Sequence, residues 1–215
     1  MNISCIIISM KSPASHASYR LENKLARQGF MLVAGIDEVG RGCLSGPLVA
    51  SAVVLPSKCR LKLYDSKSIS YQQRQELSQG IYDVALGVGL GWVSNDKIDD
   101  FGLAWALKEA YEQALVDLDL AVSRIILDGN CNYLEDYEIC QTIVAADSKV
   151  ACVAAASIVA KVARDKYMLD LSDKYPQYGY QTNSGYGTLL HRQAIRDFGL
   201  TDLHRKSFCK NLISA

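Results

Sequence analysis

Hydrophobic residues along this chain gather in short runs that predict five strands. The runs are dense in Val, Ile, Leu, Ala and Gly and are bounded by Gly, Pro, Ser or Asp, which is typical of buried strands. They cover residues 32–39, 46–56, 86–94, 124–130 and 140–147. Only residues 40–45 separate the first two runs, so we expect them to pair as an antiparallel hairpin. The last run predicts a strand that ends at Asp147.

Four other segments predict helices, because they carry apolar residues at helical spacing or are rich in good helix formers. They cover residues 70–85, 103–118, about 150–174 and 188–199. Ser70, followed three residues later by Gln73, forms the capping-box pattern that begins a helix. Lys161 and Asp165 stand four residues apart and can pair across one helical turn. Gly199 predicts the end of the last helix.

The order of these elements predicts an α/β fold in one domain. A strand hairpin followed by strands that alternate with helices favours a mixed sheet flanked by helices, with a helical C-terminal region over about 150–215. A length of 215 residues suits one domain. Residues 1–18 contain "SPASHAS" and predict a loose N-terminal extension, so the domain is expected to span 19–215.

Composition narrows the class of protein without deciding its function. The chain is 49% hydrophobic and 21% charged, which allows a sizeable core and gives no sign of disorder. Its formal net charge is zero, so total charge favours neither nucleic acid nor a membrane as partner, although a local basic groove remains compatible with it. No apolar run approaches about 18 residues, so we expect no membrane span. Seven scattered cysteines lack metal-ligand spacing and predict reduced thiols in a cytoplasmic protein.

Acidic residues stand at the ends of three predicted strands. They are Asp37 with its neighbour Glu38, then Asp128, then Asp147. Strand ends are where α/β proteins build their sites, and converging carboxylates would repel one another unless Mg²⁺ or Mn²⁺ neutralised them. Each acid also has a structural interpretation as a turn residue, a helix cap or a strand edge, and alternation places Asp37 and Glu38 on opposite faces. The pattern alone supports both interpretations about equally.

The turn after the first strand contains Gly40, Arg41 and Gly42. Its spacing matches neither a dinucleotide-binding fingerprint nor a P-loop, so binding of a nucleoside triphosphate is disfavoured. Glycines would let the backbone approach a polyanion closely, with Arg41 available for a phosphate. A tight hairpin turn with a solvated arginine is the alternative.

The C-terminal part of the chain combines tyrosines with basic residues. Tyr178, Tyr180 and Tyr186 precede Arg192, Arg196, Arg205, Lys206 and Lys210. Such a set suits a phosphate backbone with a sugar or base stacked on an aromatic ring, but it also suits a solvated helix beside a packing loop. The three histidines, His16, His191 and His204, lack zinc-like spacing, and we expect them to be structural or exposed.

Six motifs, in order from about residue 19 to residue 208, resemble those of bacterial ribonuclease HII. They are "GIDEVGRG", "GPLVASAVVL", "YDSKSIS", "ILDGN", "ADSKVACVAAASIVAKVARD" and "SGYGTLLH". One departure is Ala146, which stands where the family usually has glycine before its fourth acid. Asp165 is the nearest rival of Asp147 for that role.

The resemblance implies a ribonuclease-H-like fold with a central mixed five-stranded sheet. It implies a site for two Mg²⁺ or Mn²⁺ ions held by Asp37, Glu38, Asp128 and Asp147. The substrate-binding residues that it implies are Gly40, Arg41, Gly42 and Tyr186, and we add Lys67 for a phosphate. The implied activity is cleavage of RNA in RNA–DNA hybrids and incision 5′ of single ribonucleotides in duplex DNA, by a monomer. The rival hypothesis is a non-catalytic nucleic-acid-binding module, which metal-dependent cleavage would exclude.

Overall fold

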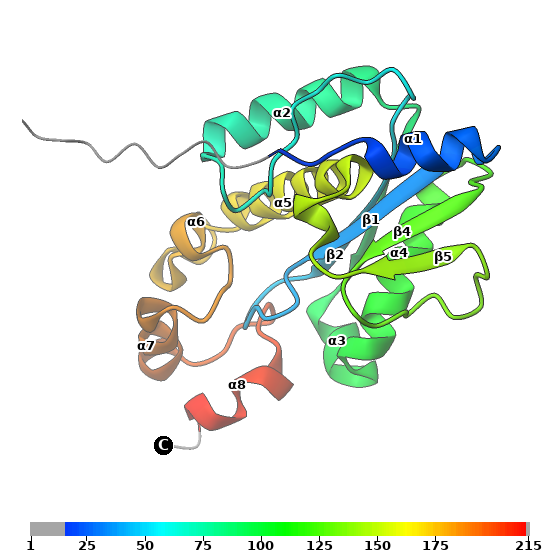
Figure 1. Cartoon of the computed structure of the whole chain (residues 1–215). Helices are drawn as coiled ribbons and strands as arrows, with labels where there is room; N and C mark the ends of the chain where they lie inside the picture. The colour runs from blue at the N-terminus through cyan, green and yellow to red at the C-terminus, as the bar shows by residue number, and fades with distance from the viewer. Residues whose placement is uncertain (1–15, 214–215) are drawn as a thin grey trace, which may run out of the picture.

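A five-stranded sheet forms the centre of the protein, and the computed structural model describes residues 16–213 around it (Figure 1). The strands are β1 (Val33–Val39), β2 (Leu48–Val54), β3 (Gly87–Val93), β4 (Arg124–Asp128) and β5 (Cys140–Ile143). Their order across the sheet is β3-β2-β1-β4-β5. The pairs β1–β2 and β2–β3 are antiparallel, whereas β1, β4 and β5 run parallel. The mixed sheet and the hairpin expected from the sequence are confirmed.

Helices cover both faces of this sheet (Figure 1). They are α1 (Arg20–Arg27), α2 (Tyr71–Val84), α3 (Asn95–Phe101), α4 (Leu103–Leu118), α5 (Ala151–Asp170), α6 (Tyr180–Asn183), α7 (Leu189–Phe198) and α8 (Lys206–Ile213), with 3₁₀ turns η1 (Ala146–Ser148) and η2 (Pro176–Tyr178). α1, α2 and α5 enclose one apolar cluster with the sheet, and α3 and α4 enclose another on the opposite face. The Ser70 and Gln73 capping box begins α2 as predicted.

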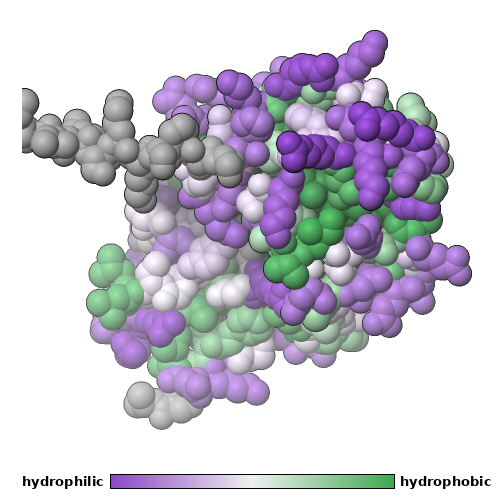
Figure 2. Space-filling model, viewed as in Figure 1, coloured by the Kyte–Doolittle hydropathy of each residue, from purple (hydrophilic) through white to green (hydrophobic). Residues whose placement is uncertain are grey.

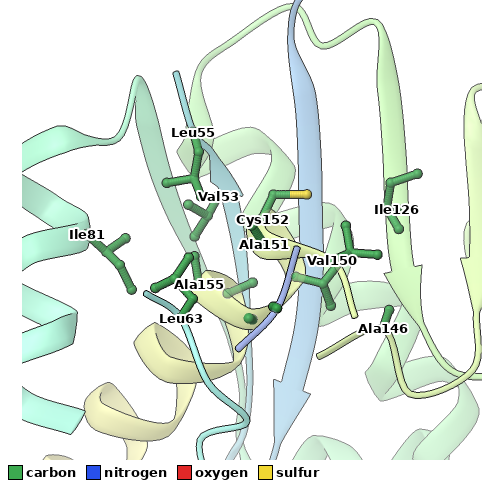
Figure 3. Packing of buried hydrophobic residues seen from close by; sticks show 14 of the residues in the cluster. Val53, Leu55, Leu63, Ile81, Ile126, Ala146, Val150, Ala151, Cys152 and Ala155 are labelled. Atoms are coloured by element: carbon green, nitrogen blue, oxygen red, sulfur yellow. The ribbon is translucent and has the colours of Figure 1, made fainter. Parts of the chain in front are cut away.

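The contact between α5 and β1 is close because Gly35 has no side chain. A Cβ at this position would lie 2.2 Å from the carbonyl carbon of Cys152. Around it, Figure 3 shows Val53 from β2, Ile81 from α2 and Ala155 from α5 gathered in one apolar cluster. The small side chains of α5 therefore let this helix lie directly on the strand that carries Asp37 and Glu38.

On the opposite face of the sheet, glycines of β3 allow a helix to approach equally closely. A Cβ on Gly91 would lie 1.9 Å from the carbonyl oxygen of Ala110, and one on Gly89 would lie 2.1 Å from that of Ala114. These glycines allow α4 to lie against the sheet backbone, which explains why glycine alternates with larger apolar residues in this strand.

The C-terminal region forms a separate apolar cluster beyond the carboxyl end of β1 (Figure 1). Met168 from α5, Ile195 from α7 and Cys209 from α8 meet in it, together with Tyr178 and Tyr180. Within residues 151–213 the predicted helical region is confirmed, but α7 is not the last helix, because α8 follows it. The sequence also did not reveal α1 and α3, which have only eight and seven residues and are shorter than the stretch of about 11 residues over which helical periodicity is counted.

Asp147 does not end a strand, which corrects the expectation from the sequence. β5 ends at Ile143, and Asp147 lies in η1. Between them Ala145 has φ 56°, a left-handed conformation that turns the chain out of the strand. A run of apolar residues does not show such a turn, so the predicted strand was too long.

The packed chain begins before the predicted domain boundary at residue 19. Ala17 is fully buried, its N–H donates to the carbonyl of Leu63, and Ser18 forms a parallel bridge with Val150. The rest of the expected N-terminal extension, residues 1–15, lies outside the described residues.

The surface seen in Figure 2 carries hydrophilic side chains along its upper rim, over α1 and α2. No helix within residues 16–213 is long and apolar enough to cross a membrane. The six cysteines in the described part of the chain are all free thiols, as their scattered positions predicted.

Candidate active site

A cavity of about 470 Å³ opens at the carboxyl end of β1. It is lined by Asp37, Glu38, Val39, Gly40, Arg41, Gly42, Ser66, Lys67, Asp128, Ser157, Lys161 and Tyr186. Every site residue predicted from the sequence is in this lining except Asp147. Residues from five separate parts of the chain therefore meet in one place, which spacing along the sequence could not show.

Asp37 and Glu38 reach the cavity from opposite faces of β1. The carboxylate of Asp37 lies on the α5 side, where Ser157 hydrogen-bonds to it. Glu38 lies on the α4 side, where the hydroxyl of Tyr111 donates to its Oε2 at 2.6 Å. The alternation expected of a strand is kept, and both side chains line one cavity because they stand close to the strand end.

Asp128 joins them because β4 runs parallel to β1. Leu127 pairs with Ile36, so Asp128 follows at the level of Asp37. Its Oδ1 accepts a 2.6 Å hydrogen bond from the backbone N–H of Ala146. The carboxyl ends of two neighbouring parallel strands thus bring the acids together.

Asp147 does not line the cavity, although it lies close enough to Asp128 and to Lys67 for their charges to act on its carboxyl. It is 9% exposed, and its neighbour Ala146 donates to Asp128. Burial raises the pKa of the Asp147 carboxyl, and the negative charge of Asp128 adds to the rise. Its rival, Asp165, accepts a 2.8 Å hydrogen bond from Lys161, the salt bridge that their spacing predicted.

The carboxylates of the cavity are electrostatically strained. Burial raises the pKa of Asp37 well above its usual range, and the charges of Glu38 and Asp128 add to this. Burial also raises the pKa of Glu38, although the Tyr111 hydroxyl and the Arg41 guanidinium act against the rise. Both shifts arise because charged carboxylates have lost water and lie near one another.

This donor set fits a hard divalent cation. Carboxylate oxygens are the ligands of Mg²⁺ and Mn²⁺, and a bound cation would offset both the lost hydration and the mutual repulsion. Within residues 16–213, however, no three Asp, Glu, His or Cys side chains converge tightly enough to chelate one ion as they stand. The acids share the cavity without forming a closed cage.

The turn after β1 is held by two buried arginines. Gly40 has φ 93°, and a Cβ there would lie 2.4 Å from Nε of Arg164. Arg164 donates to the carbonyls of Ser45, Pro47 and Ser184. These bonds tie the segment after the turn to the loop that precedes Tyr186.

Arg205, the residue directly before α8, supports the same turn. It is fully buried, and it donates to the carbonyls of Gly46 and Arg41. The side chain of Arg41 is instead about half exposed, with its Nη1 3.6 Å from Oε1 of Glu38. The hypothesis that Arg205 binds phosphate is therefore wrong: this guanidinium is used inside the fold.

Tyr186 faces the turn across the cavity. It forms an antiparallel bridge with Cys43, and its side chain is 37% exposed. The ammonium of Lys161 lies 5.6 Å from the centre of its ring and the guanidinium of Arg164 lies 5.9 Å from it. Tyr178 is buried in the C-terminal cluster, as is Tyr180, so neither can serve as a stacking surface.

Lys67 is exposed at the rim of the cavity, in the segment before α2. Its N–H donates to Oδ1 of Asp65, which shapes a local turn. Its neighbour Ser66 is buried, with its Oγ 3.0 Å from Oγ of Ser157. The Ser66–Ser157 contact links the Lys67 segment to the hydroxyl that holds Asp37.

Sequence reasoning missed several groups that build the site: Tyr111, Ser157, Lys161 and Arg164. Ser157, Lys161 and Arg164 share one signal, since they are polar residues within the otherwise apolar, alanine-rich stretch that became α5. Tyr111 had no comparable signal, because a tyrosine at helical spacing reads as a core residue.

Comparison with known proteins shows which family this chain resembles. The profile of the family described as Ribonuclease HII matches residues 34–211. The ribonuclease HII of Desulfotalea psychrophila is 42% identical over 207 residues, covering 94% of this chain and 91% of its own.

Solved structures agree with the sequence comparison. The crystal structure of ribonuclease H2 from Pyrococcus horikoshii superposes with a TM-score of 0.70 at 25% identity, covering 86% of this chain and 98% of its own. Ribonuclease HII of Archaeoglobus fulgidus, solved in complex with PCNA, gives a TM-score of 0.71 at 28% identity over 81% of this chain and 93% of its own. With the profile match over most of its length, this chain belongs to the ribonuclease HII family.

Proposed function

We propose that this protein hydrolyses the RNA strand of RNA–DNA hybrids and incises 5′ of single ribonucleotides embedded in duplex DNA, leaving 3′-hydroxyl and 5′-phosphate ends. The observation that carries the proposal is the shared cavity. Three carboxylates line it together with a glycine-rich turn and an exposed tyrosine. The carboxylates supply a place for cations beside a phosphodiester, and the other two elements supply surfaces for its sugars.

Asp37, Glu38 and Asp128 would hold the cations, and Asp147, whose carboxyl is influenced by the charge of Asp128, would complete the set. Two bound Mg²⁺ or Mn²⁺ ions would supply an activated water and stabilise the charge on the leaving oxygen. The protein's own contribution is to hold the acids in place. Ser157 and Tyr111 fix the orientation of the two acids of β1 from opposite sides.

The turn from Gly40 to Gly42 would read the ribose. The 2′-hydroxyl distinguishes RNA from DNA and can both donate and accept hydrogen bonds. A Cβ on Gly42 would meet nothing within 4 Å, so the backbone on this side is open to a ligand. Arg164 and Arg205 hold the carbonyls around the turn, which keeps its backbone groups at fixed positions.

Tyr186 would stack on the sugar of the next nucleotide. Tyr186 lines the cavity, and its backbone forms a bridge with Cys43, directly after the glycine turn. An unhydroxylated sugar fits against the ring, whereas a 2′-hydroxyl would collide with it, and this favours a ribonucleotide followed by a deoxynucleotide.

Basic side chains at the rim would hold phosphates. Lys67 is exposed there, and Arg41 is about half exposed beside Glu38. Point charges of this kind position the backbone without reading sequence.

The decisive experiment uses a DNA duplex with one ribonucleotide, labelled at the 5′ end of that strand. Incubation with Mg²⁺ or Mn²⁺ is expected to give a single cut on the 5′ side of the ribonucleotide. An all-DNA duplex and a reaction with EDTA are the controls. Absence of any cut with either metal would contradict the proposed function.

Asp128→Asn tests the assignment of the acids separately. The amide keeps the size of the side chain but removes its charge, so we expect activity to fall about 1,000-fold or more, in the range of lost charge stabilisation at a catalytic centre. Asp165→Asn is the matched control, since Asp165 is paired with Lys161, and it should retain most activity. Full activity of Asp128→Asn would show that the acids were assigned wrongly even if wild type cleaves.

A further inference from the structure

A chain of hydrogen bonds runs through the interior beneath Tyr186, outside the cavity lining. The backbone nitrogen of Thr201 lies 2.9 Å from Nδ1 of His204, and Nε2 of His204 lies 3.2 Å from Nε2 of His191. Nδ1 of His191 then lies 2.9 Å from the carbonyl oxygen of Tyr186. Both imidazoles are buried, at 0% and 1% exposure.

The proton positions in this chain follow from its Thr201 end. A backbone N–H can only donate, so Nδ1 of His204 accepts and carries no hydrogen. In a neutral imidazole the hydrogen is then on Nε2 of His204, which donates to Nε2 of His191. That nitrogen accepts, so the hydrogen of His191 is on Nδ1.

The Tyr186 end gives the same assignment independently. A carbonyl oxygen can only accept, so Nδ1 of His191 must donate to Tyr186. The surrounding hydroxyls agree: Oγ of Ser45 lies 3.3 Å from Nε2 of His191 and accepts from the Tyr180 hydroxyl. Each group in the chain therefore has one direction of donation, and reversing any one of them would place two hydrogens or two lone pairs face to face.

We propose that His191 is a positioning residue for Tyr186, and that His204 and the N–H of Thr201 fix the tautomer in which it acts. The donated hydrogen bond holds the peptide of Tyr186 toward the interior, and this presents the ring to the cavity. The carbonyl of Tyr186 also accepts from Thr188 at the start of α7, so the histidine adds a second, rigid anchor from the same helix. The inference rests on the proposed function, because it assigns Tyr186 to the substrate.

Burial favours the uncharged form of both His191 and His204. Lost hydration lowers the pKa of His191, and burial with the neighbouring imidazole lowers the pKa of His204 to about 4. At neutral pH both rings therefore carry one hydrogen each, as the chain requires.

Nuclear magnetic resonance tests the tautomers without any variant. The chain has three histidines, so ¹⁵N-labelled rings can be assigned from long-range proton–nitrogen spectra. We expect hydrogen on Nδ1 of His191 and on Nε2 of His204 at pH 7.5. The opposite tautomer of either ring would overturn the proposal.

Kinetics test the positioning role. His191→Phe keeps a ring but removes the donor, whereas the amide of His191→Asn places an N–H near the position of Nδ1. We expect His191→Phe to lower kcat at a single ribonucleotide roughly 10- to 100-fold, with a smaller loss on a long hybrid, because a misplaced contact group costs rate in this range. His191→Asn should restore most of the loss at the single ribonucleotide.

The control is Tyr178→Phe. Tyr178 contacts both imidazoles with its ring, and its hydroxyl donates to the carbonyl oxygens of Phe198 and Gly199 and interacts with the side chain of Gln177, not with either imidazole nitrogen. This variant should loosen the same cluster and lower Tm without changing the ratio of the two activities. An unchanged ratio in folded His191→Phe, or no restoration by His191→Asn, would overturn the positioning role while leaving wild-type incision, and hence the proposed function, intact.

Discussion

The two acids of β1 are held by hydroxyl donors from helices on opposite faces of the sheet. Ser157 of α5 bonds to Asp37, and Tyr111 of α4 bonds to Glu38. Neutral donors orient a carboxylate without cancelling its charge, so the acids remain available to a cation. Arg164 and Arg205 likewise support the neighbouring glycine turn, by donating to backbone carbonyls around it. At the scale of the residue, the site depends as much on these supporting groups as on the acids.

Tyr111→Phe is expected to lower activity about 10-fold, as loss of a group that orients a ligand commonly does. The pKa of Glu38 should rise because the hydroxyl that stabilises its charged form is gone, so the acid limb of the pH–rate profile should move to higher pH. Tyr133→Phe is the matched control, because Tyr133 lies beside Tyr111 but its hydroxyl bonds only weakly to Arg41, at 3.4 Å. Equal profiles for the two variants would contradict this role of Tyr111.

Tyr186→Ala is expected to lose about 10-fold or more in activity at single ribonucleotides, which is the scale of one lost aromatic stacking contact. Tyr186→Phe keeps the ring and should retain most of this activity. Cleavage rates on a single-ribonucleotide duplex and on a long RNA–DNA hybrid provide the comparison. An equal loss on both substrates would count against stacking at the junction.

At the scale of elements, glycines set how closely helices approach the sheet. Gly35 brings α5 onto β1, and Gly89 and Gly91 bring α4 onto β3. The sequence indicated that there are five strands, but it did not indicate which helix each glycine would meet. The over-long fifth strand shows the same limit, because the left-handed turn at Ala145 has no hydrophobic signature.

Gly35→Ala is expected to destabilise the fold by about 3 kcal/mol, since the new Cβ would collide with backbone and not with a movable side chain. α5 would have to shift, and it carries Ser157 and Lys161 of the cavity, so the folded protein should also lose activity. Gly80→Ala is the control, and it is expected to change stability in the opposite direction. Its Cβ would meet only a side-chain carbon of Leu61 at 3.7 Å, so helix propensity should stabilise α2 by about 1 kcal/mol. Urea unfolding measures both, and a neutral Gly35→Ala would contradict the close-contact argument.

At the scale of the whole molecule, the cavity lies between the sheet and the C-terminal helices. Arg164 and Arg205 join the two by donating to carbonyls of the segment that follows β1 and, from Arg164, of Ser184. The buried imidazoles belong to the same junction. Loss of this junction would therefore separate Tyr186 from the acids. Because the junction contains buried histidines, the stability of the folded protein should depend on pH.

The free energy of unfolding should fall as pH drops from 6.5 toward 4 because of His204. Its pKa is about 4 when folded and near 6.5 when unfolded, so the unfolded chain binds more protons in this window. The expected loss from this residue is about 2 kcal/mol between pH 7 and pH 5. The raised pKa values of Asp37 and Glu38 act in the opposite direction, so the measurement is the difference between wild type and His204→Phe, in which they cancel. A difference that stays constant with pH would contradict the prediction.

The sequence by itself determined the five strands, the longer helices and the candidate acids, because local signals mark each of these. Hydrophobic runs marked the five strands, the capping box at Ser70 marked α2, and acids at the ends of strands marked Asp37 and Asp128 as candidates. Resemblance of six motifs to ribonuclease HII then named the fold and the residues, including Gly40 and Tyr186.

Only the tertiary structure decided which of these groups meet and how they are held. Parallel pairing of β4 with β1 brings Asp128 to the level of Asp37, and the strand end lets Glu38 join from the other face. The same packing buries Arg205, which the sequence had left open as a phosphate-binding or a solvated residue, and it buries His191 and His204, which were expected to be structural or exposed. Contacts between residues more than a hundred positions apart depend on the register of strands and the approach of helices, and neither is written in any local pattern.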